Sequence, residues 1–451
     1  MFLIKEIEFI DYKKNEVIMI NLINGATDII ERNIYNLIIN NQFDKLDKET
    51  INCLIDRRYL FNSEEEYNSF IIGLDERIEE LEKSAIPNFL VVPSYACNLR
   101  CIYCYEQTYM IKGTTDIDPI EMVDIQFDRI DKIMHNYELK YGKSSDEVRI
   151  TIMGGEPLLR CNFSTIEHIF KSAKKRNYTI DIVSNGVDLN HYIDLFNRYK
   201  NTLKHIQITV DGIKEFHDKR RIFYDGRGSF DLIMKNIKLA IDNDVIIVLR
   251  VNVDNTNIDG LPDLANELVE QFNYDERLRP YLYLLQDGGC SGEKNIVEEK
   301  IGIEKIFKLE ETNPNMTIFR KKFHPENFID SIFNDTPYQP VLRHCGASKN
   351  QFILDCKSNV YKCWHGIGSN DYRVGTFYPN YILDDRKINA WFDRSVKVIP
   401  KCKNCKYRYI CGTGCPAAKH MSDDKMNISD TSCVNYNELI KIMVLEKMKK
   451  Y

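Results

Sequence analysis

Hydrophobic and polar positions change their spacing several times along this 451-residue chain. Between residues 88 and 290, short and nearly continuous apolar runs alternate with longer stretches in which apolar residues recur every three or four positions. Such runs are typical of strands buried on both faces, and the longer spacing is typical of amphipathic helices. We therefore predict an α/β fold with a parallel sheet covered on both faces. The predicted strands are 88–94, 148–153, 179–184, 205–210, 246–253 and 280–285, and the helices are 117–136, 163–174, 189–199, 229–242 and 260–271.

The first 85 residues follow a different pattern. Alternating apolar residues flank the polar segment Asp11 to Glu16 and predict two short strands. Asn24-Gly25 predicts a turn, and from Ile29 onward apolar residues recur at helical spacing. Two further amphipathic stretches follow, and residues 74–83 are expected to form a charged helical linker. We expect a small β-hairpin and three helices.

The periodic pattern weakens after residue 290. Residues 291–339 are charged and helical and then loop-like, which predicts a bridging segment. From 340 to 435, cysteine, glycine, lysine and aromatic residues dominate, and long periodic runs are few. We expect this segment to bury little core and to depend on bound metal for its folding. Residues from Glu438 onward predict a terminal helix.

The composition, 43% hydrophobic and 28% charged, is that of an ordinary globular protein. A formal net charge of −6 without a basic tract does not indicate a nucleic-acid partner. Because no apolar run approaches about 18 residues, no membrane-spanning helix is expected. The first residues are not those of a signal peptide. Fourteen cysteines in such a chain favour a cytoplasmic location and metal-bound thiolates over disulfides.

Three cysteines lie in the loop after the strand predicted at 88–94. Cys97, Cys101 and Cys104 have the spacing C-x3-C-x2-C. Three thiolates can bind three irons of a [4Fe–4S] cluster and leave the fourth iron open, whereas ordinary ferredoxin clusters use four cysteines. A structural zinc site uses four ligands, usually in C-x2-C pairs. The triplet matches neither of these two patterns well, and a zinc knuckle is the alternative.

The triplet and its surroundings resemble the signature of the radical S-adenosylmethionine (SAM) enzymes, in which the open iron binds SAM. The resemblance implies a partial (β/α)6 barrel, with Cys97, Cys101 and Cys104 as catalytic cluster ligands. It also implies that the remaining SAM contacts gather at the C-terminal ends of the strands. Isolated turns and a structural ion pair of Arg250 are the alternatives. The implied cofactor-binding residues are Tyr103, Gly154, Gly155, Glu156, Ser184, Asn185 and Arg250. The stretch from Val210 to Arg221 resembles a family element that combines turn structure with an arginine, here Arg221, near substrate or SAM.

Seven more cysteines form a second group near the C-terminus. Four of them have the spacing C-x2-C-x5-C-x3-C. This group resembles the SPASM extension of radical SAM enzymes, which carries two auxiliary [4Fe–4S] clusters, so the chain would bind three clusters in total. A pair of zinc ribbons is the alternative. The resemblance implies Cys345, Cys363 and Cys415 as ligands of the first auxiliary cluster and Cys402, Cys405, Cys411 and Cys433 as ligands of the second.

Three positions depart from the family pattern. Ser358 stands where a glycine is usual, Gln339 where sulfatase maturases carry a fourth cysteine ligand, and Trp364 where those maturases carry an aspartate thought to act as a base. The first auxiliary cluster would then have an iron open to a substrate cysteine, with Cys356 as a rival fourth ligand. The four cysteines outside the motifs are expected to be buried thiols. They are Cys53, Cys161, Cys290 and Cys356.

These resemblances imply a radical SAM/SPASM enzyme that generates a 5′-deoxyadenosyl radical and crosslinks a ribosomally made precursor peptide, with a thioether as one product. The N-terminal hairpin and helices resemble the winged-helix peptide-recognition element of such maturases, which would bind a leader peptide at a free sheet edge. A packing cap is the alternative. An external electron donor such as flavodoxin or ferredoxin is also implied. Anaerobic sulfatase maturation and a non-catalytic iron–sulfur electron carrier are the other functions considered.

The predicted domain organisation follows from the patterns and the resemblances together. Residues 1–85 would form the winged-helix-like domain, 86–310 the radical SAM partial barrel, 311–339 a bridging segment, 340–435 the SPASM domain with two auxiliary clusters, and 436–451 a C-terminal helix.

Overall fold

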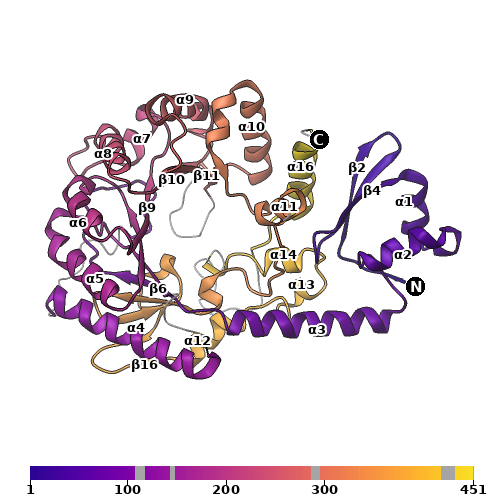
Figure 1. Ribbon diagram of the computed structural model, residues 1–451, viewed down its shortest axis with the longest axis horizontal. Helices are drawn as coiled ribbons and strands as arrows, with labels where there is room; N and C mark the ends of the chain where they lie inside the picture. Colours follow the sequence, from indigo (N-terminus) through magenta and orange to yellow (C-terminus); the bar gives the residue numbers. More distant parts are fainter. Residues whose placement is uncertain (107–116, 143–147, 286–294, 335, 418–431, 450–451) are drawn as a thin grey trace.

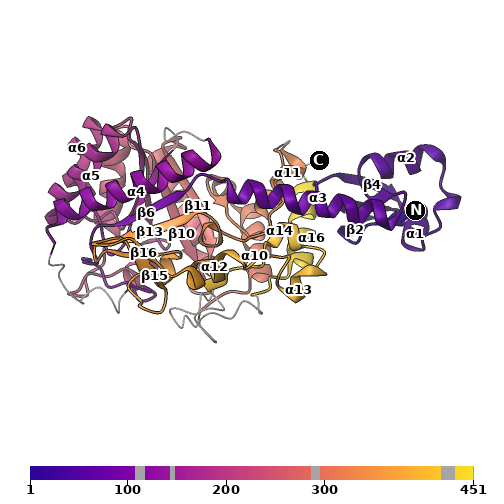
Figure 2. The same ribbon diagram turned by 90° about the horizontal axis from the view of Figure 1, so that it is seen from below.

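The computed structural model describes residues 1–106, 117–142, 148–285, 295–334, 336–417 and 432–449. A curved sheet with helices on its outer side fills one end of the molecule, and a small N-terminal unit lies at the other end (Figure 1). Helix α3 (Glu64–Lys83) runs between them, and the molecule is elongated along this helix (Figure 2). In the described part of the chain, no helix combines the length and the apolar character that a membrane crossing requires.

The six predicted parallel strands are confirmed, and each overlaps its predicted range. They lie side by side in chain order, with the helices between them on the outer face (Figure 1). Local signals support these elements: the Asp118 side chain caps α4 by accepting from Ile120 N, and Gly142 ends it at φ +68°. The strands are β6 (Asn88–Val92), β7 (Arg149–Ile152), β8 (Thr179–Ser184), β9 (Leu203–Thr209), β10 (Ile247–Val253) and β11 (Leu278–Leu284), and the helices are α4 (Pro119–Tyr141), α5 (Phe163–Lys175), α6 (Ile193–Arg198), α7 (Lys214–Arg220), α8 (Phe230–Asp242) and α9 (Leu261–Phe272).

The sheet continues beyond both ends of the predicted barrel. Strand β12 (Arg320–Lys321) joins β11, and β13 (Gln351–Asp355) pairs in parallel with β6. Three antiparallel strands follow β13, so the sheet has eleven strands within the described ranges. The prediction that residues 340–435 bury little core is wrong, because these short strands carry Ile353, Val360 and Val374 into the core of the barrel. The remaining elements of this half are β14 (Asn359–Tyr361), β15 (Arg373–Thr376), β16 (Ile382–Leu383), α10 (Glu299–Thr312), α11 (Glu326–Phe333), α12 (Asp385–Phe392), α13 (Pro400–Lys403), α14 (Arg408–Cys411) and α16 (Tyr436–Met448).

The turn between β13 and β14 is strained at Ser358, which has φ +65°. Replacing Ser358 by glycine should stabilise the protein by about 0.5–1 kcal/mol, because the left-handed region costs other residues about 1–2 kcal/mol and the freedom of glycine in the unfolded chain offsets part of the gain. Calorimetry should show a Tm higher by about 1–2 °C. Ser358→Ala, which keeps a Cβ, is the control and should give no increase. A lower Tm for the glycine variant would contradict the expected relief.

The N-terminal unit contains a three-stranded antiparallel sheet in the order β2-β3-β4. The helix expected from Ile29 begins only at Arg32, because Thr27–Glu31 form a third strand that the sequence analysis missed. The third helix and the charged segment after it form one continuous helix, α3. The elements are β1 (Phe2–Leu3), β2 (Ile7–Lys13), β3 (Glu16–Asn21), β4 (Thr27–Glu31), α1 (Arg32–Ile39), α2 (Lys48–Asp56) and β5 (Leu60–Phe61), with β1 paired to β5.

The N-terminal unit packs against the C-terminal cysteine-rich segment. Ile4, Ile7 and Tyr59 share one hydrophobic core with Ile399 and Tyr409. A buried carboxylate at the end of α3 strengthens this contact. Glu82 accepts hydrogen bonds from Leu342 N at 3.0 Å and from the Arg343 guanidinium at 2.8 Å. The two ends of the chain are therefore parts of one packed structure.

Candidate active site

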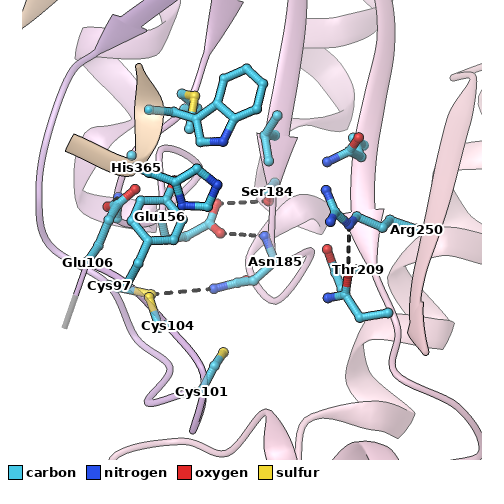
Figure 3. Close-up of a pocket in the computed structure, with 18 of the residues that line it drawn as sticks. Cys97, Cys101, Cys104, Glu106, Glu156, Ser184, Asn185, Thr209, Arg250 and His365 are labelled. Carbon is cyan, nitrogen blue, oxygen red and sulfur yellow. Dashed lines mark hydrogen bonds between the residues drawn. The ribbon is translucent and has the colours of Figure 1, made fainter. Parts of the chain in front are cut away.

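A cavity of about 490 Å³ lies inside the curved sheet. Side chains from the inner face of the parallel strands line it, including Leu90, Val183 and Asn252. The three cysteines of the triplet lie at one side of the cavity, with Arg250 across from them (Figure 3). The structure thus brings the triplet to the interior of the barrel, where the parallel strands also place the other predicted site residues.

The triplet loop follows β6 directly. It is anchored by two backbone hydrogen bonds to the end of α7, from Arg100 N to Ile222 O at 2.7 Å and from Ile102 N to Arg220 O at 3.0 Å. Burial, and to a lesser degree the nearby Glu156, raises the pKa of Cys97 to about 12. Thiols must lose their protons to bind iron, and the positive charge of bound iron favours the thiolate form. The donor set of three adjacent thiols therefore fits a cluster with one open iron.

The glycine turn after β7 lies against this loop. A Cβ on Gly155, which has φ +53°, would lie 2.4 Å from Ala96 O, and a Cβ on Gly154 would lie 2.5 Å from a methyl carbon of Val92. Only glycine allows so close an approach to the backbone before Cys97. The Gly155 N–H donates to Glu106 Oε2 at 2.5 Å, a partner that the sequence analysis missed. Glu106 is only two residues after Cys104, the last cysteine of the triplet. This position beside the motif was the sequence signal that could have pointed to it.

Glu156 holds the polar turn at the end of β8. Its buried carboxylate accepts from Ser184 Oγ at 2.8 Å and from Asn185 N at 2.5 Å. Burial raises its pKa to about 7, although these hydrogen bonds oppose the increase. The Asn185 side chain in turn donates to Asn98 Oδ1 at 2.7 Å within the triplet loop. Three predicted SAM contacts therefore lie together, with the side chains of Glu156 and Ser184 engaged in orienting the site.

Tyr103 joins the triplet loop to the ends of two strands. Its hydroxyl donates to Asp211 Oδ2 at 2.6 Å and accepts from Arg221 Nη1 at 2.8 Å and from Asn252 Nδ2 at 3.3 Å. Burial raises the pKa of Tyr103, so the phenol stays protonated. Asp211 and Asn252 were not singled out from the sequence, although the Asp211-Gly212 turn marked the place. This network fixes the position of the ring in the cavity wall.

Arg250 contributes a positive charge to the cavity. Its Nε donates to Asn252 Oδ1 at 2.7 Å, and its guanidinium lies 4.1 Å from the centre of the Tyr283 ring. Both partners are uncharged, so the arginine keeps its attraction for an anionic group. A carboxylate such as that of SAM or of a peptide is a suitable partner in this position.

The cavity extends to the second cysteine group, because Cys415, Trp364 and His365 also line it. Burial, and then the nearby Cys415 thiol, raises the pKa of Cys345. Cys363 follows β14, which runs antiparallel to β13, so it lies beside the start of β13 and near Cys345. Cys356 lies at the opposite end of this hairpin. The five residues of β13 separate the two ends by roughly 16 Å, which disfavours Cys356 as a ligand of the same cluster.

The other four cysteines of the second group are also neighbours. Burial raises the pKa of Cys411 to about 12, and the thiols of Cys402, Cys405 and Cys433 contribute to the increase. Among the described residues, no three His, Cys, Asp or Glu side chains are arranged to hold a single metal ion. In a [4Fe–4S] cluster each thiolate binds its own iron, so such a site does not gather three sulfurs around one metal.

Two of the four cysteines outside the motifs differ from expectation. Cys53 and Cys161 are exposed rather than buried, because each lies on the outer surface of a short helix. Cys356 is partly buried beside Asp355 and Lys357. The prediction for Cys290 lies outside the residues that the structure describes.

Comparison with known proteins identifies the catalytic domain. Residues 91–268 match the Radical SAM superfamily. The cysteine-type anaerobic sulfatase-maturating enzyme of Clostridium novyi is 24% identical over 351 residues, which cover 73% of this chain and 87% of that protein. The serine-type anaerobic sulfatase-maturating enzyme of Bacteroides thetaiotaomicron is 26% identical over 347 residues, which cover 71% and 80%.

Two solved structures share the fold. The enzyme anSMEcpe with bound AdoMet matches with a TM-score of 0.56 at 17% identity, covering 81% of this chain and 94% of that one. Streptococcus suis SuiB bound to S-adenosylmethionine matches with a TM-score of 0.55 at 14% identity, covering 96% of this chain and 99% of that one. Residues 91–268 therefore form a radical SAM domain, in a chain that is similar in sequence to anaerobic sulfatase-maturating enzymes and shares the fold of anSMEcpe and SuiB.

Proposed function

We propose that this enzyme crosslinks a ribosomally made precursor peptide and that the bond formed is a thioether. One observation carries the proposal: a single cavity is lined by the Cys97 triplet at one side and by Cys415 and Trp364 at another. A peptide side chain in this cavity would lie between the two groups of cysteines. When bound, the first cluster and SAM supply a 5′-deoxyadenosyl radical that abstracts a hydrogen atom.

The chain's own residues suit a peptide substrate. Gln207, Thr209 and Asn252 give the cavity uncharged hydrogen-bonding groups, and Arg250 gives it a cation. These groups can orient backbone amides and a carboxylate, while the apolar strand residues exclude water. The radical would then meet one positioned side chain instead of solvent.

The open ligand position of the first auxiliary cluster supports the thioether. Position 339 is a glutamine, and Cys356 lies at the far end of the β13–β14 hairpin. An iron short of a ligand can bind a thiol and lower its pKa. Thioether formation removes one hydrogen atom from a peptide carbon and one proton from the thiol, and it releases one electron. Two auxiliary clusters would accept that electron, and an external donor such as flavodoxin or ferredoxin would reduce the first cluster.

The test is turnover of a cysteine-containing peptide encoded beside this protein's gene. Reconstituted enzyme, SAM, dithionite and that peptide should give a product two hydrogens lighter with one alkylatable thiol fewer, both read by mass spectrometry. A lighter product that keeps every free thiol would overturn the thioether, and no change in peptide mass would overturn peptide crosslinking.

A second candidate, sulfatase maturation, is favoured by the names of the two sulfatase-maturating relatives. Trp364 stands where those maturases carry an aspartate, and its indole has no atom that can act as a base. A sulfatase-derived peptide with a central cysteine should therefore remain unoxidised in the same assay. Oxidation of that cysteine would make this second candidate the correct one.

The free edge of the N-terminal sheet is the proposed dock of a leader peptide. Strand β4 lies at one edge of the β2-β3-β4 sheet, and its Ile29 is 49% exposed. The other edge, β2, carries Glu8, whose carboxylate contacts Lys406 at 2.9 Å. Strand β4 is therefore the edge that an extended peptide can extend by strand addition.

Replacing Ile29 by glutamate should weaken leader binding about tenfold or more, because burying an isoleucine contributes about 1.5–3 kcal/mol. Fluorescence anisotropy of a labelled leader measures the affinity. Leu81→Glu, on the part of α3 near the barrel and 61% exposed, is the matched control and should leave it unchanged. Point variants are preferable to deleting residues 1–85, because deletion would expose Ile399 and Tyr409. Equal turnover of full-length and leaderless peptide would refute leader recognition.

A further inference from the structure

The loop between Cys405 and Cys411 is held by the opposite end of the chain. Lys406 Nζ lies 2.9 Å from Glu8 Oε2, and the Tyr407 hydroxyl donates to the same carboxylate. Arg408 Nη2 lies 3.2 Å from Glu6 Oε1. The next side chain, Tyr409, contacts helix α3, because its hydroxyl donates to Asp75 Oδ1 at 2.7 Å.

The contacts are buried as well as charged. Glu6 is 0% exposed and Glu8 is 5% exposed. The Tyr67 hydroxyl, from α3, donates to Glu6 Oε2 at 2.7 Å and fixes its orientation. Tyr409 and Cys402 also belong to the hydrophobic core that contains Ile4 and Ile7. A buried carboxylate needs such partners, so the acidic residues and the basic loop depend on each other.

The loop has little local structure of its own. Helices α13 and α14, which carry Cys402 and Cys411, are four residues each. Helices of one turn are unstable without tertiary contacts. The relative position of Cys405 and Cys411 in space is therefore maintained by packing against a distant part of the chain. Tyr407 and its partner Glu8, for example, are 399 residues apart in sequence.

One aromatic pair connects this interface to a cysteine. The Tyr407 ring stacks on the Tyr436 ring at 6.1 Å, and Tyr436 lies beside the Cys411 thiol. A change at Glu8 is thus two side chains away from a predicted cluster ligand.

We propose that Glu6 and Glu8 are positioning residues for the second auxiliary cluster, which assembles only when the N-terminal unit holds the Cys405–Cys411 loop. This inference rests on the two auxiliary clusters of the proposed function. It gives the N-terminal unit a role in cluster assembly besides peptide recognition.

The test uses the full-length Glu6→Ala/Glu8→Ala variant, reconstituted with iron and sulfide. Iron should fall from about twelve to about eight per chain, a loss of one cluster. The electron paramagnetic resonance spectrum of the reduced variant should lose one auxiliary signal and keep the first-cluster signal, which is recognised by its change on adding SAM. Asp11→Asn is the matched control, because Asp11 lies on the same strand in an exposed ion pair with Arg32 at 2.7 Å and should keep all the iron.

Two further variants separate positioning from general folding. The charge swap Glu8→Lys with Lys406→Glu should keep the iron that the double alanine variant loses. Glu8→Gln should also keep this iron but shift the spectrum of the second auxiliary cluster. Full iron in the double alanine variant would overturn the proposal. Loss of iron from every cluster would also overturn it, because the two carboxylates would then support the whole chain. Unmodified protein with only about four irons would instead contradict the proposed function.

Discussion

Replacing Cys97, Cys101 and Cys104 together by alanine should abolish formation of 5′-deoxyadenosine. The three thiols line the cavity on one anchored loop, and removing them would take away all three proposed ligands of the cluster that activates SAM. Because the other seven motif cysteines lie on separate elements, iron should fall only from about twelve to about eight per chain. Chromatography of the reaction mixture and iron analysis of the same sample measure both effects.

The matched control for this variant is Cys53→Ala, which removes an exposed thiol on α2 in the N-terminal unit. It should form 5′-deoxyadenosine at the unmodified rate and keep all its iron. Retention of 5′-deoxyadenosine formation by the triple alanine variant would show that the triplet is not the catalytic cluster site.

Gly155→Ala should lower the rate of SAM cleavage about a hundredfold. The added Cβ would lie 2.4 Å from Ala96 O and 2.7 Å from the carbonyl carbon of Tyr95, both backbone atoms that cannot rotate away. The triplet loop would have to shift, and a displacement of about 1 Å in a reacting geometry costs about 10²-fold in rate. The rate of 5′-deoxyadenosine formation under saturating SAM measures the effect.

Gly142→Ala separates this clash from backbone strain. Gly142 also has a positive φ, +68°, but its Cβ would meet nothing within 4 Å. Its variant should cleave SAM at the unmodified rate. Equal rates for both glycine variants would show that the close approach of the β7 turn to the triplet loop is unimportant.

The six strands of the barrel could be predicted because each has a short apolar run and a helical spacing beside it. Strand β4 could not, because Ile29 and Ile30 precede Ile34 and Leu37 at a spacing that also fits a helix. A short apolar run next to a helix fits the spacing of a strand and also that of a helix. For residues 27–31, the pairing with β3 is what makes this segment a strand.

Site residues were predicted where they belong to motifs of fixed spacing. They were missed where their role depends on contacts with residues far away in the sequence. Cys97 and Gly155 were placed on the cavity because they follow the ends of β6 and β7, whereas Arg250, expected at a strand end, lies in the middle of β10 and still lines the cavity. Glu106 and Asp211 were not, because their roles come from hydrogen bonds to Gly155 N and to the Tyr103 hydroxyl, each formed with a residue from another part of the chain. Local sequence does not encode such partners.

The contacts of the loop from Lys406 to Ile410 could not be predicted from local sequence either. Its charge pattern is that of a solvated basic loop, yet Tyr409 is fully buried and Arg408 lies beside a fully buried glutamate. The acidic partners Glu6 and Glu8 are equally unremarkable in sequence, since alternating charges are common on strand surfaces. Only the packed structure brings the two ends of the chain together.

The pairing of β13 with β6 affects how the chain folds during its synthesis. Asn88 and Gln351, which are hydrogen bonded across this pair at 3.4 Å, are 263 residues apart. At a synthesis rate of about 5–20 residues per second, roughly 10–50 s pass before the ribosome delivers the partner strand. During that interval the apolar strand Phe89–Val92 has an unpaired edge, which can associate with other chains. We therefore expect the nascent chain to be most prone to aggregation before β13 has been synthesised.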